Sequence, residues 1–329
     1  SHDPMYIRWT QWIFLKFYEA GLVYRDNAPV NWCPGCQTVL ANEQVLGDGT
    51  CERSGDPVEQ RDMEQWFYRI TAYAQQLLDD MDSVDWPEKV KVMQRHWIGR
   101  SEGAEFGLPV AEADGSARED VAPLAVFTTR PDTSFGMTFA VISPEHPRVD
   151  ELTTDKERAT VDAFRASVAG RSEIDRLSTE GSLDKRGVAT GCRVVNPFTG
   201  QAIPVFLADY VLMTYGTGAI MAVPGEDQRD WDFAVAHGCE IIRTVQPPDD
   251  FHGEAYVGEG PAINSSFLNG LEVAEAKVAA IDWLEAEGHG VRKVNYRLRD
   301  WLLSRQRYWG CPIPIVYCDG CGEQPVPVD

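Results

Sequence analysis

The eight cysteines of this chain limit what it can fold into more than any other feature of the sequence. Two close pairs, Cys33-x-x-Cys36 and Cys318-x-x-Cys321, stand among cysteines that are otherwise scattered singly. Such pairs are typical of metal-binding knuckles, and the pattern differs from the framework of a disulfide-stapled secreted domain. It favours a protein of a reducing cytoplasm. The second pair is either half of a knuckle or two free thiols in a hairpin.

The first pair lies in a segment, residues 31–62, that carries too few large apolar side chains to fold on a core of its own. Cys33 and Cys36 are followed by Cys51-Glu-Arg-Ser54, which has the outline of a zinc ribbon with two knuckles about fifteen residues apart. Ser54 takes the fourth position, and a neutral serine is a poor zinc ligand. The site therefore recruits another group, binds zinc weakly, or has lost its metal and holds by packing.

Length and charge narrow the class of protein. The 329 residues suffice for about two domains, and the 43% of hydrophobic residues include no run of about 18 that could span a bilayer. The net charge of -21 argues against binding nucleic acid through overall charge, so any such site must be locally basic. One stretch is basic, through Arg292, Lys293, Arg297, Arg299, Arg305 and Arg307.

The pattern of apolar residues predicts a helical first part and a mixed remainder. From about residue 103 the chain changes to short apolar runs separated by glycine, proline and aspartate, which predicts an α/β fold with several strands. Expected helices lie at 5–20, 66–81, 87–97, 155–168 and 271–287, with a shorter one starting near Asp227. Expected strands are Leu124–Phe127, Phe139–Ile142 and Ala219–Val223.

Two polar clusters follow expected strands. Thr128-Thr129-Arg130-Pro-Asp-Thr133 places three hydroxyls, a guanidinium and a carboxylate within six residues. A capped turn after the strand would account for the same residues, because threonine and aspartate often cap the next element.

The second cluster runs from Tyr215 to Asp230 and places Asp227 and Asp230 three residues apart at an expected helix start. At that spacing two carboxylates can face one ligand. A helix cap with an acidic first turn is the simpler interpretation for Asp227 alone.

Seven ordered blocks of the chain resemble leucyl-tRNA synthetases of bacterial type, which are class I aminoacyl-tRNA synthetases. These blocks are Trp9-Thr-Gln-Trp12, Ala28-Pro-Val-Asn-Trp32-Cys33-Pro, Thr38-Val-Leu-Ala-Asn-Glu-Gln44, Trp97-Ile-Gly-Arg-Ser101, Thr128 to Thr133, Tyr215 to Asp230, and Leu298-Arg-Asp-Trp301 through Ser304 to Gly310. The threonine-rich block followed by Phe135-Gly136 is most similar to the leucyl branch. Valyl and isoleucyl enzymes share the architecture and remain the alternative.

The resemblance implies an editing domain at 101–292 inserted in a nucleotide-binding-fold core, of which 1–100 and 293–329 are pieces and 31–62 is the zinc-type module. Because the chain starts without methionine and contains neither His-x-Gly-His nor Lys-Met-Ser-Lys-Ser, we expect a fragment that does not activate leucine. ATP and Mg would belong to the full-length enzyme, a leucine-tRNA ligase. The expected partner is the 3' end of leucine tRNA, and we expect a cytoplasmic monomer.

For the fragment, the resemblance implies hydrolysis of mischarged aminoacyl-tRNA. Thr133 would exclude leucine by crowding its side chain, and Asp230 would pair with the aminoacyl ammonium, supported by Asp227. The residues implied to surround the terminal adenosine and the ester are Thr128, Thr129 and Arg130; those implied to bind the substrate are Tyr215, Met221, Val223, Asp227 and Arg229; those implied to bind metal are Cys33, Cys36 and Cys51.

Two positions depart from the family pattern. Glu226 stands where many relatives have a histidine, which adds negative charge, and Ser54 breaks the usual four-cysteine knuckle. A catalytically silent, zinc-stabilised tRNA-docking module is the alternative from another class, because the stretch from Arg292 to Arg307 is basic.

Overall fold

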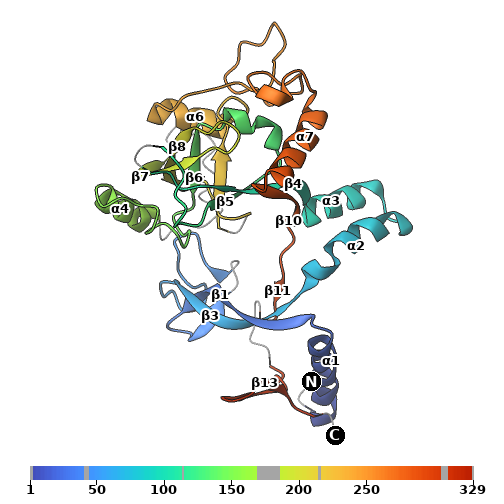
Figure 1. The fold of residues 1–329 in the computed structure, drawn as a ribbon. Coiled ribbons are helices and arrows are strands. Elements are labelled where there is room, and N and C mark those ends of the chain that lie inside the picture. The colour runs from blue at the N-terminus through green and yellow to red at the C-terminus, as the bar shows by residue number, and fades with distance from the viewer. Residues whose placement is uncertain are drawn as a thin grey trace. The chain divides into compact units, whose positions relative to one another are not determined.

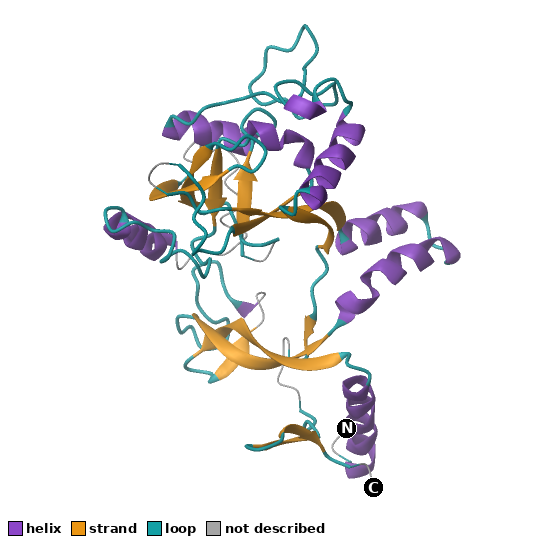
Figure 2. Ribbon diagram, viewed as in Figure 1, coloured by secondary structure: helices purple, strands orange, loops and turns teal. Residues whose placement is uncertain are grey.

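The computed structural model of the chain describes residues 3–40, 44–112, 115–168, 186–213, 216–304 and 310–327. The chain divides into two compact units, the first made of Ser1–Arg100 and Tyr296–Asp329 and the second of Ser101–Asn295. Helices and strands alternate in both (Figures 1 and 2), which confirms a mixed α/β fold. The assignment of the first unit to a catalytic core stays a prediction.

The first unit is built on a sheet in the order β11-β3-β1-β2. Its long strands β1 and β3 pair antiparallel from Val23↔Tyr68 to Trp32↔Glu59. A separate hairpin is formed by β12 and β13. The elements of this unit are α1 (Pro4–Glu19), β1 (Val23–Cys33), β2 (Thr38–Leu40), β3 (Glu59–Tyr68), α2 (Ala74–Asp79), α3 (Glu88–Ile98), β11 (Trp301–Leu302), β12 (Ile315–Cys318) and β13 (Gly322–Pro325), with short 3₁₀ helices at Ile70–Tyr73 and Asp80–Ser83.

The expected helix over 66–81 is wrong at its start. Trp66 and Phe67 belong to β3, and helical structure begins only at Ile70. Trp66 packs edge-on against Phe14 in the cluster between α1 and the sheet, and Phe67 pairs with Tyr24 of β1. Pairing with a distant strand has overridden the local helical spacing.

The second unit contains two sheets, of order β10-β4-β5 and β7-β8-β6-β9. In the larger sheet β6 runs parallel to β8 and antiparallel to β9. Its elements are β4 (Arg100–Leu108), β5 (Leu124–Thr128), the 3₁₀ helix η4 (Pro131–Gly136), β6 (Phe139–Ile142), α4 (Arg158–Val168), β7 (Gly187–Val195), β8 (Ala202–Ala208), β9 (Ala219–Ala222), α6 (Gln228–His237), the 3₁₀ helix η5 (Ser266–Leu268), α7 (Val273–Ala286) and β10 (Gly290–Tyr296).

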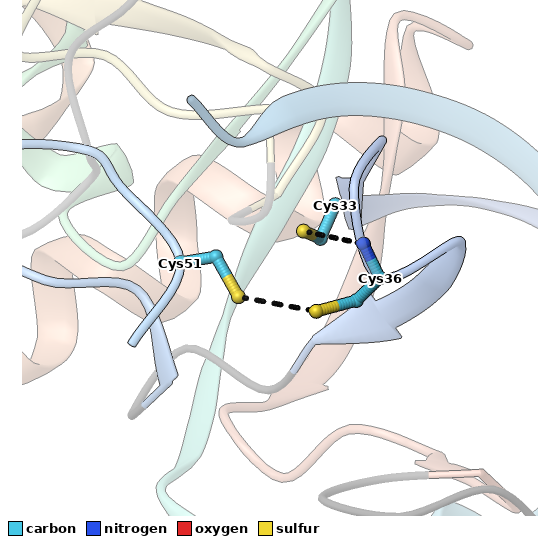
Figure 3. A group of neighbouring side chains, drawn as sticks. All are labelled: Cys33, Cys36 and Cys51. Carbon is cyan, nitrogen blue, oxygen red and sulfur yellow. Dashed lines mark hydrogen bonds between the residues drawn. The ribbon is translucent and has the colours of Figure 1, made fainter. Parts of the chain in front are cut away.

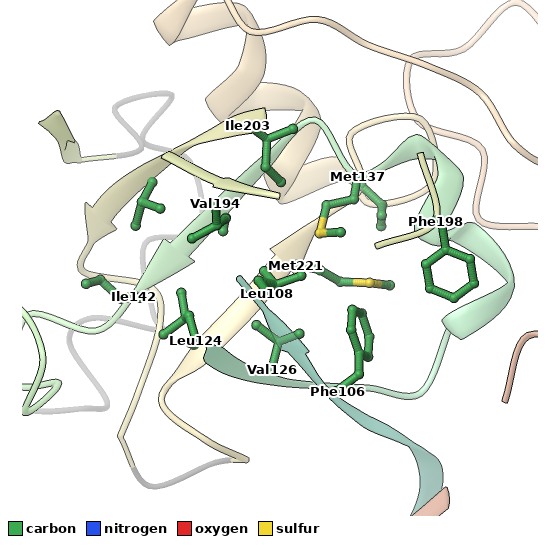
Figure 4. Packing of buried hydrophobic residues seen from close by; sticks show 14 of the residues in the cluster. Phe106, Leu108, Leu124, Val126, Met137, Ile142, Val194, Phe198, Ile203 and Met221 are labelled. Carbon is green, nitrogen blue, oxygen red and sulfur yellow. The ribbon is translucent and has the colours of Figure 1, made fainter. Parts of the chain in front are cut away.

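Strand β6 of the larger sheet is buried on both faces. Successive residues of β6 alternate, so that Phe139 and Val141 pack towards Phe233 of α6, while Ala140 and Ile142 face the main core. That core joins both sheets and α7 (Figure 4). Strands buried on both faces carry continuous apolar runs, which is why the short runs of the sequence identified β6 and β9.

The remaining expected helices are confirmed, as α1, α3, α4, α6 and α7. Asp227 is the N-cap of α6, and its side chain accepts hydrogen bonds from the backbone N–H groups of Arg229 and Asp230. Among the described residues, no helix combines the length and the apolar character needed to cross a membrane.

Candidate functional site

The turn after β5 is a deeply buried polar segment of the second unit. All six residues of η4 are buried, and Thr133 is fully inaccessible to solvent. The Thr133 hydroxyl donates to the Arg130 carbonyl at 2.8 Å, and the Arg130 backbone N–H donates to the Thr128 hydroxyl at 2.9 Å. Both bonds are local to the turn, and Arg130, the N-cap of η4, makes no side-chain cap, so the hydroxyls support the turn without capping the helix. Thr129 lies half-buried just after the strand.

Arg130 and Asp132 form a two-pronged ion pair within this turn. The guanidinium donates through Nε at 3.0 Å and through Nη2 at 2.8 Å to the two carboxylate oxygens. The Asp132 side chain is only 1% exposed, so the pair is largely shielded from water. Burial opposes the charged form of Arg130, but the Asp132 carboxylate outweighs it and raises the pKa of the guanidinium. The ion pair therefore fixes the orientation of the Arg130 guanidinium at the start of η4.

The second turn connects β9 to α6, and five of the expected residues lie in it or at its two ends. Met221 and Val223 are buried at its start, Asp227 caps the helix, and Arg229 is exposed. Arg229 donates to Asp227 through Nη2 at 3.1 Å, and this bond raises the pKa of the guanidinium. The negative charges of Asp227 and Asp230 stabilise α6, because they lie at the positive end of its helix dipole.

Asp230 is 4% exposed and has a partner for each carboxylate oxygen. Oδ2 accepts the backbone N–H of Val223 at 2.8 Å, and Oδ1 accepts the Tyr210 hydroxyl at 3.4 Å. Burial and then the neighbouring Asp227 raise the pKa of Asp230 to about 7. A cation beside Asp230 would lower this raised pKa, because a positive charge favours the ionised form of a carboxylate.

The two turns lie side by side at β9. The Ser134 hydroxyl of η4 donates to the Met221 sulfur at 3.4 Å, and Val223, two residues further along, binds Asp230. The fold therefore brings the threonine-rich turn and the acidic turn together, through Met221 and Val223. Tyr215 lies outside the described residues.

Sequence reasoning overlooked two partners of these residues. Asp132 was only one member of a polar cluster, although its position two residues after Arg130 on a tight turn is a usable signal. Tyr210 contributes the hydroxyl on Asp230 from the loop after β8, twenty residues earlier in the chain. No local sequence signal joins Tyr210 to Asp230, because only the sheet places them together.

The three expected metal ligands of the first unit converge (Figure 3). The Sγ atoms of Cys33, Cys36 and Cys51 all lie within 4.8 Å of one another, with Cys36 and Cys51 3.9 Å apart. Thiolates bound to one tetrahedral zinc at about 2.3 Å lie roughly 3.8 Å apart, so the arrangement fits. Backbone N–H groups, first that of Ser54, lower the pKa of Cys51 to about 6, which favours the thiolate that a metal needs. The Ser54 hydroxyl lies 3.2 Å from the Cys33 sulfur.

Two side chains of the basic stretch form ion pairs within the second unit. Arg292 pairs with Glu102 and Asp282, and Lys293 pairs with Glu105. Arg305 and Arg307 lie outside the described residues. Arg292 and Lys293 are thus engaged by acidic neighbours, which weakens the case for a simple nucleic-acid docking patch.

Comparison with family models gives two matches. The model described as "Leucyl-tRNA synthetase, editing domain" matches residues 95–285, and the model for "tRNA synthetases class I (I, L, M and V)" matches residues 2–102. The first range contains both turns, and the second contains the cysteine module.

Similar proteins of known name agree with these matches. A leucine–tRNA ligase of Nocardioides sp. is 55% identical over all of this chain, and one of Rubrobacter xylanophilus is 54% identical over 99% of it. The chain spans 39% of the length of each. A solved ternary complex of an Agrobacterium radiobacter LeuRS with tRNA and LeuAMS is 40% identical, with a TM-score of 0.72 over 99% of this chain and 37% of that one.

Proposed function

Because this chain belongs to the leucyl-tRNA synthetase editing-domain family, we propose that its second unit hydrolyses the ester bond of mischarged leucine tRNA. The observation that carries the proposal is the meeting of the two turns at Met221 and Val223, inside the range that the editing-domain model matches. A hydrophobic pocket separates amino acids that differ by one methylene only about 10- to 200-fold, so a ligase for leucine gains from a second, hydrolytic site.

The reaction proposed here needs no side-chain nucleophile. Asp230 pairs with the ammonium of the aminoacyl group, with Asp227 adding negative charge from the helix cap. Arg130, held in place by Asp132, contacts the terminal adenosine beside Thr128 and Thr129. A water positioned by these fixed dipoles and by the terminal ribose hydroxyl then attacks the ester carbonyl, and the tRNA 3' oxygen leaves with a proton.

The same proposal assigns selectivity to Thr133. It is fully buried and its hydroxyl is held by the Arg130 carbonyl, so the side chain cannot swing away from a bulky substrate. Met221, Val223 and Tyr215 would line the pocket beside it, and Arg229 would contact a phosphate or the tRNA end. The leucine side chain is rejected because it needs the space that Thr133 occupies.

In the first unit, we propose that Cys33, Cys36 and Cys51 hold one zinc ion. The distances between their sulfur atoms and the lowered pKa of Cys51 support this site. The ion would cross-link turns that share only a small apolar cluster.

For the whole protein, we propose leucine–tRNA ligase activity dependent on ATP and Mg, in a cytoplasmic monomer that binds leucine tRNA. The names of the full-length relatives support this activity. A valyl or isoleucyl preference is the weaker candidate, because the matched editing model is that of the leucyl branch.

The test compares deacylation of norvalyl-, isoleucyl- and leucyl-tRNA. The chain should cleave the first two and spare leucyl-tRNA, and Thr133→Ala, which opens about two heavy atoms of space, should cleave leucyl-tRNA as well. Thr133→Val is the matched control, since it keeps the volume and loses the hydroxyl, and it should still spare leucyl-tRNA. If Thr133→Ala cleaves norvalyl-tRNA yet leaves leucyl-tRNA intact, Thr133 only supports the turn.

A further inference from the structure

Glu226 is the one carboxylate of the acidic turn that the proposed reaction does not use. It lies between β9 and α6 and is 5% exposed. Its Oε1 atom accepts two backbone N–H groups, that of Thr244 at 2.6 Å and that of Val245 at 3.2 Å. One side-chain oxygen therefore fastens a segment that lies eighteen residues further along the chain.

That segment, Ile242–Val245, packs against both turns of the candidate site. A Cβ added to Gly136, the last residue of η4, would lie 2.9 Å from the Ile242 carbonyl oxygen. A Cβ added to Gly225 would lie 2.3 Å from the same oxygen. Both glycines are needed because the Ile242 carbonyl comes so close.

The segment Ile242–Val245 is itself anchored by later residues. Val245 forms a β-bridge with Ala262, and the Thr244 carbonyl accepts the N–H of Ile263. Glu226 Oε2 lies 3.6 Å from a Cβ added to Gly136, and its charge is among those that act on Arg130. Glu226 thus stands where η4, the acidic turn and Ile242–Val245 meet.

We propose that Glu226 is a positioning residue for the leucine-rejecting wall: by holding the Thr244 and Val245 N–H groups, it presses Ile242–Val245 against Gly136 and so fixes the turn that carries Thr133. This inference rests on the editing function proposed above. The inference has a simple physical basis. A fully buried turn makes few contacts with water, so the position of η4 depends on the segment that packs on it. Displacement of a substrate-contacting group by about 1 Å can change a rate about 100-fold.

Three substitutions separate the hydrogen-bond acceptor from the charge. Glu226→Gln removes the charge and keeps an oxygen that can accept both N–H groups. Glu226→Asp keeps the charge, but its shorter side chain cannot reach both groups. Glu226→Met keeps the length and removes the acceptor. Glu254→Met is the matched control, because it removes an exposed carboxylate from the loop that follows Ile242–Val245.

Single-turnover deacylation of norvalyl- and leucyl-tRNA gives the main readout. Glu226→Gln and Glu254→Met should keep the selectivity of the unchanged chain, whereas Glu226→Asp and Glu226→Met should raise the rate on leucyl-tRNA relative to norvalyl-tRNA about tenfold or more. Amide exchange measured on the same proteins should quicken at Thr244 and Val245 in Glu226→Asp and stay slow in Glu226→Gln.

The opposite grouping, with Glu226→Asp selective and Glu226→Gln not, would show that the charge matters and would overturn the inference. Equal slowing on both esters in Glu226→Asp would also overturn it, since that is a general loss of structure. If Glu226→Met does not fold, the comparison of the aspartate and glutamine variants still decides. An unchanged chain that fails to cleave norvalyl-tRNA overturns the proposed function itself, and the selectivity role falls with it. If the unchanged chain cleaves norvalyl-tRNA and Glu226→Asp keeps the same selectivity, only the inference about Glu226 is overturned.

Discussion

The cysteine module of the first unit and the paired turns of the second unit both place polar groups at the ends of strands, but they are held together differently. The module has a small buried cluster of Cys33, Leu40 and Cys51, so its thiols are a large share of its own interior. The paired turns sit on a core that joins two sheets and α7. Arg130 and Asp230 of the turns find their partners within the chain, through Asp132, the Val223 N–H and Tyr210. Among the described residues, Glu226 Oε2 is buried without a hydrogen-bond partner.

Because of this difference, substitutions should affect different properties in the two sites. In the turns, backbone and side-chain hydrogen bonds define the geometry before any ligand arrives, which is the preorganisation that catalysis requires. In the module, three sulfur atoms already lie at metal-binding distances, but a metal would supply most of the energy that keeps them there. Substitutions in the turns should therefore alter stability and rate, whereas those in the module should alter metal affinity.

The largest expected effect is the loss of the ion pair in η4. Arg130→Met leaves the Asp132 carboxylate buried without its partner, and we expect unfolding free energy to fall by about 3 to 5 kcal/mol. Arg118→Met is the control, because Arg118 pairs with the exposed Asp120, and its loss should change stability little. Urea denaturation of the three proteins measures both. Equal, small losses would mean that the turn is held by packing alone.

Next in size is the effect of Asp230 on hydrolysis. Asp230→Ala removes the carboxylate proposed to pair with the aminoacyl ammonium, a loss on the order of 2 to 5 kcal/mol for a buried pair. We expect every aminoacyl ester to be cleaved more slowly by a similar factor, without altered choice among them. Asp232→Ala in the same helix should keep most of the activity. A variant that slows norvalyl-tRNA but not isoleucyl-tRNA would contradict an ammonium contact common to all substrates.

In the module, Ser54→Cys should sharpen the comparison through metal affinity. A fourth thiolate beside Cys33 completes the tetrahedral set, and we expect zinc to bind on the order of tenfold more tightly or better. Competition with a chelator, together with elemental analysis of the purified proteins, measures the change. The deacylation rate should stay the same. Two chelator-resistant zinc equivalents in the unchanged chain would contradict a single three-thiolate site.

The smallest effect is a pH dependence of stability that Asp230 causes. Its pKa is about 7 in the folded chain and the ordinary 3.8 when exposed, so the folded state binds more protons between these values. Stability should therefore fall as pH rises from about 4 to 7, and the loss should be complete above pH 7.

Asp230→Asn keeps an oxygen for the Val223 N–H and cannot ionise. Relative to the unchanged chain, it should gain stability as pH rises, on the order of 1 to 4 kcal/mol by pH 8, while it loses hydrolysis. Denaturation midpoints at pH 5 and pH 8 test this. A stability difference that is the same at both values would show that Asp230 is ionised throughout.

The sequence singled out two polar clusters, but not the residues that surround them. Thr133, Met221 and Asp230 were selected from two clusters that follow apolar runs, and the structure brings those clusters together at β9. Their roles in hydrolysis stay predictions. The ion pair of Arg130 with Asp132 is local and was within reach of sequence reasoning, whereas the contact of Tyr210 with Asp230 was not.

Local pattern failed where a long-range contact competed with it. Trp66 and Phe67 have helical spacing with the residues that follow, yet they lie in β3 because they pair with Arg25 and Tyr24 of β1. Similarly, Glu226 was noted as a departure from the family pattern, but its bonds to Thr244 and Val245 come from a segment with no recognisable signal in the sequence.

By itself, the sequence determined what depends on neighbours within a few residues: the apolar strands, the Asp227 cap of α6, the cysteine spacing and the blocks that mark the family. Tertiary structure alone decided which polar groups share a partner, as Asp230 does with Tyr210 and Glu226 with Thr244. The physical reason is range. Capping and periodicity act within one or two turns of chain, whereas the pKa of a buried carboxylate is fixed by the distant segments that pack around it and exclude water.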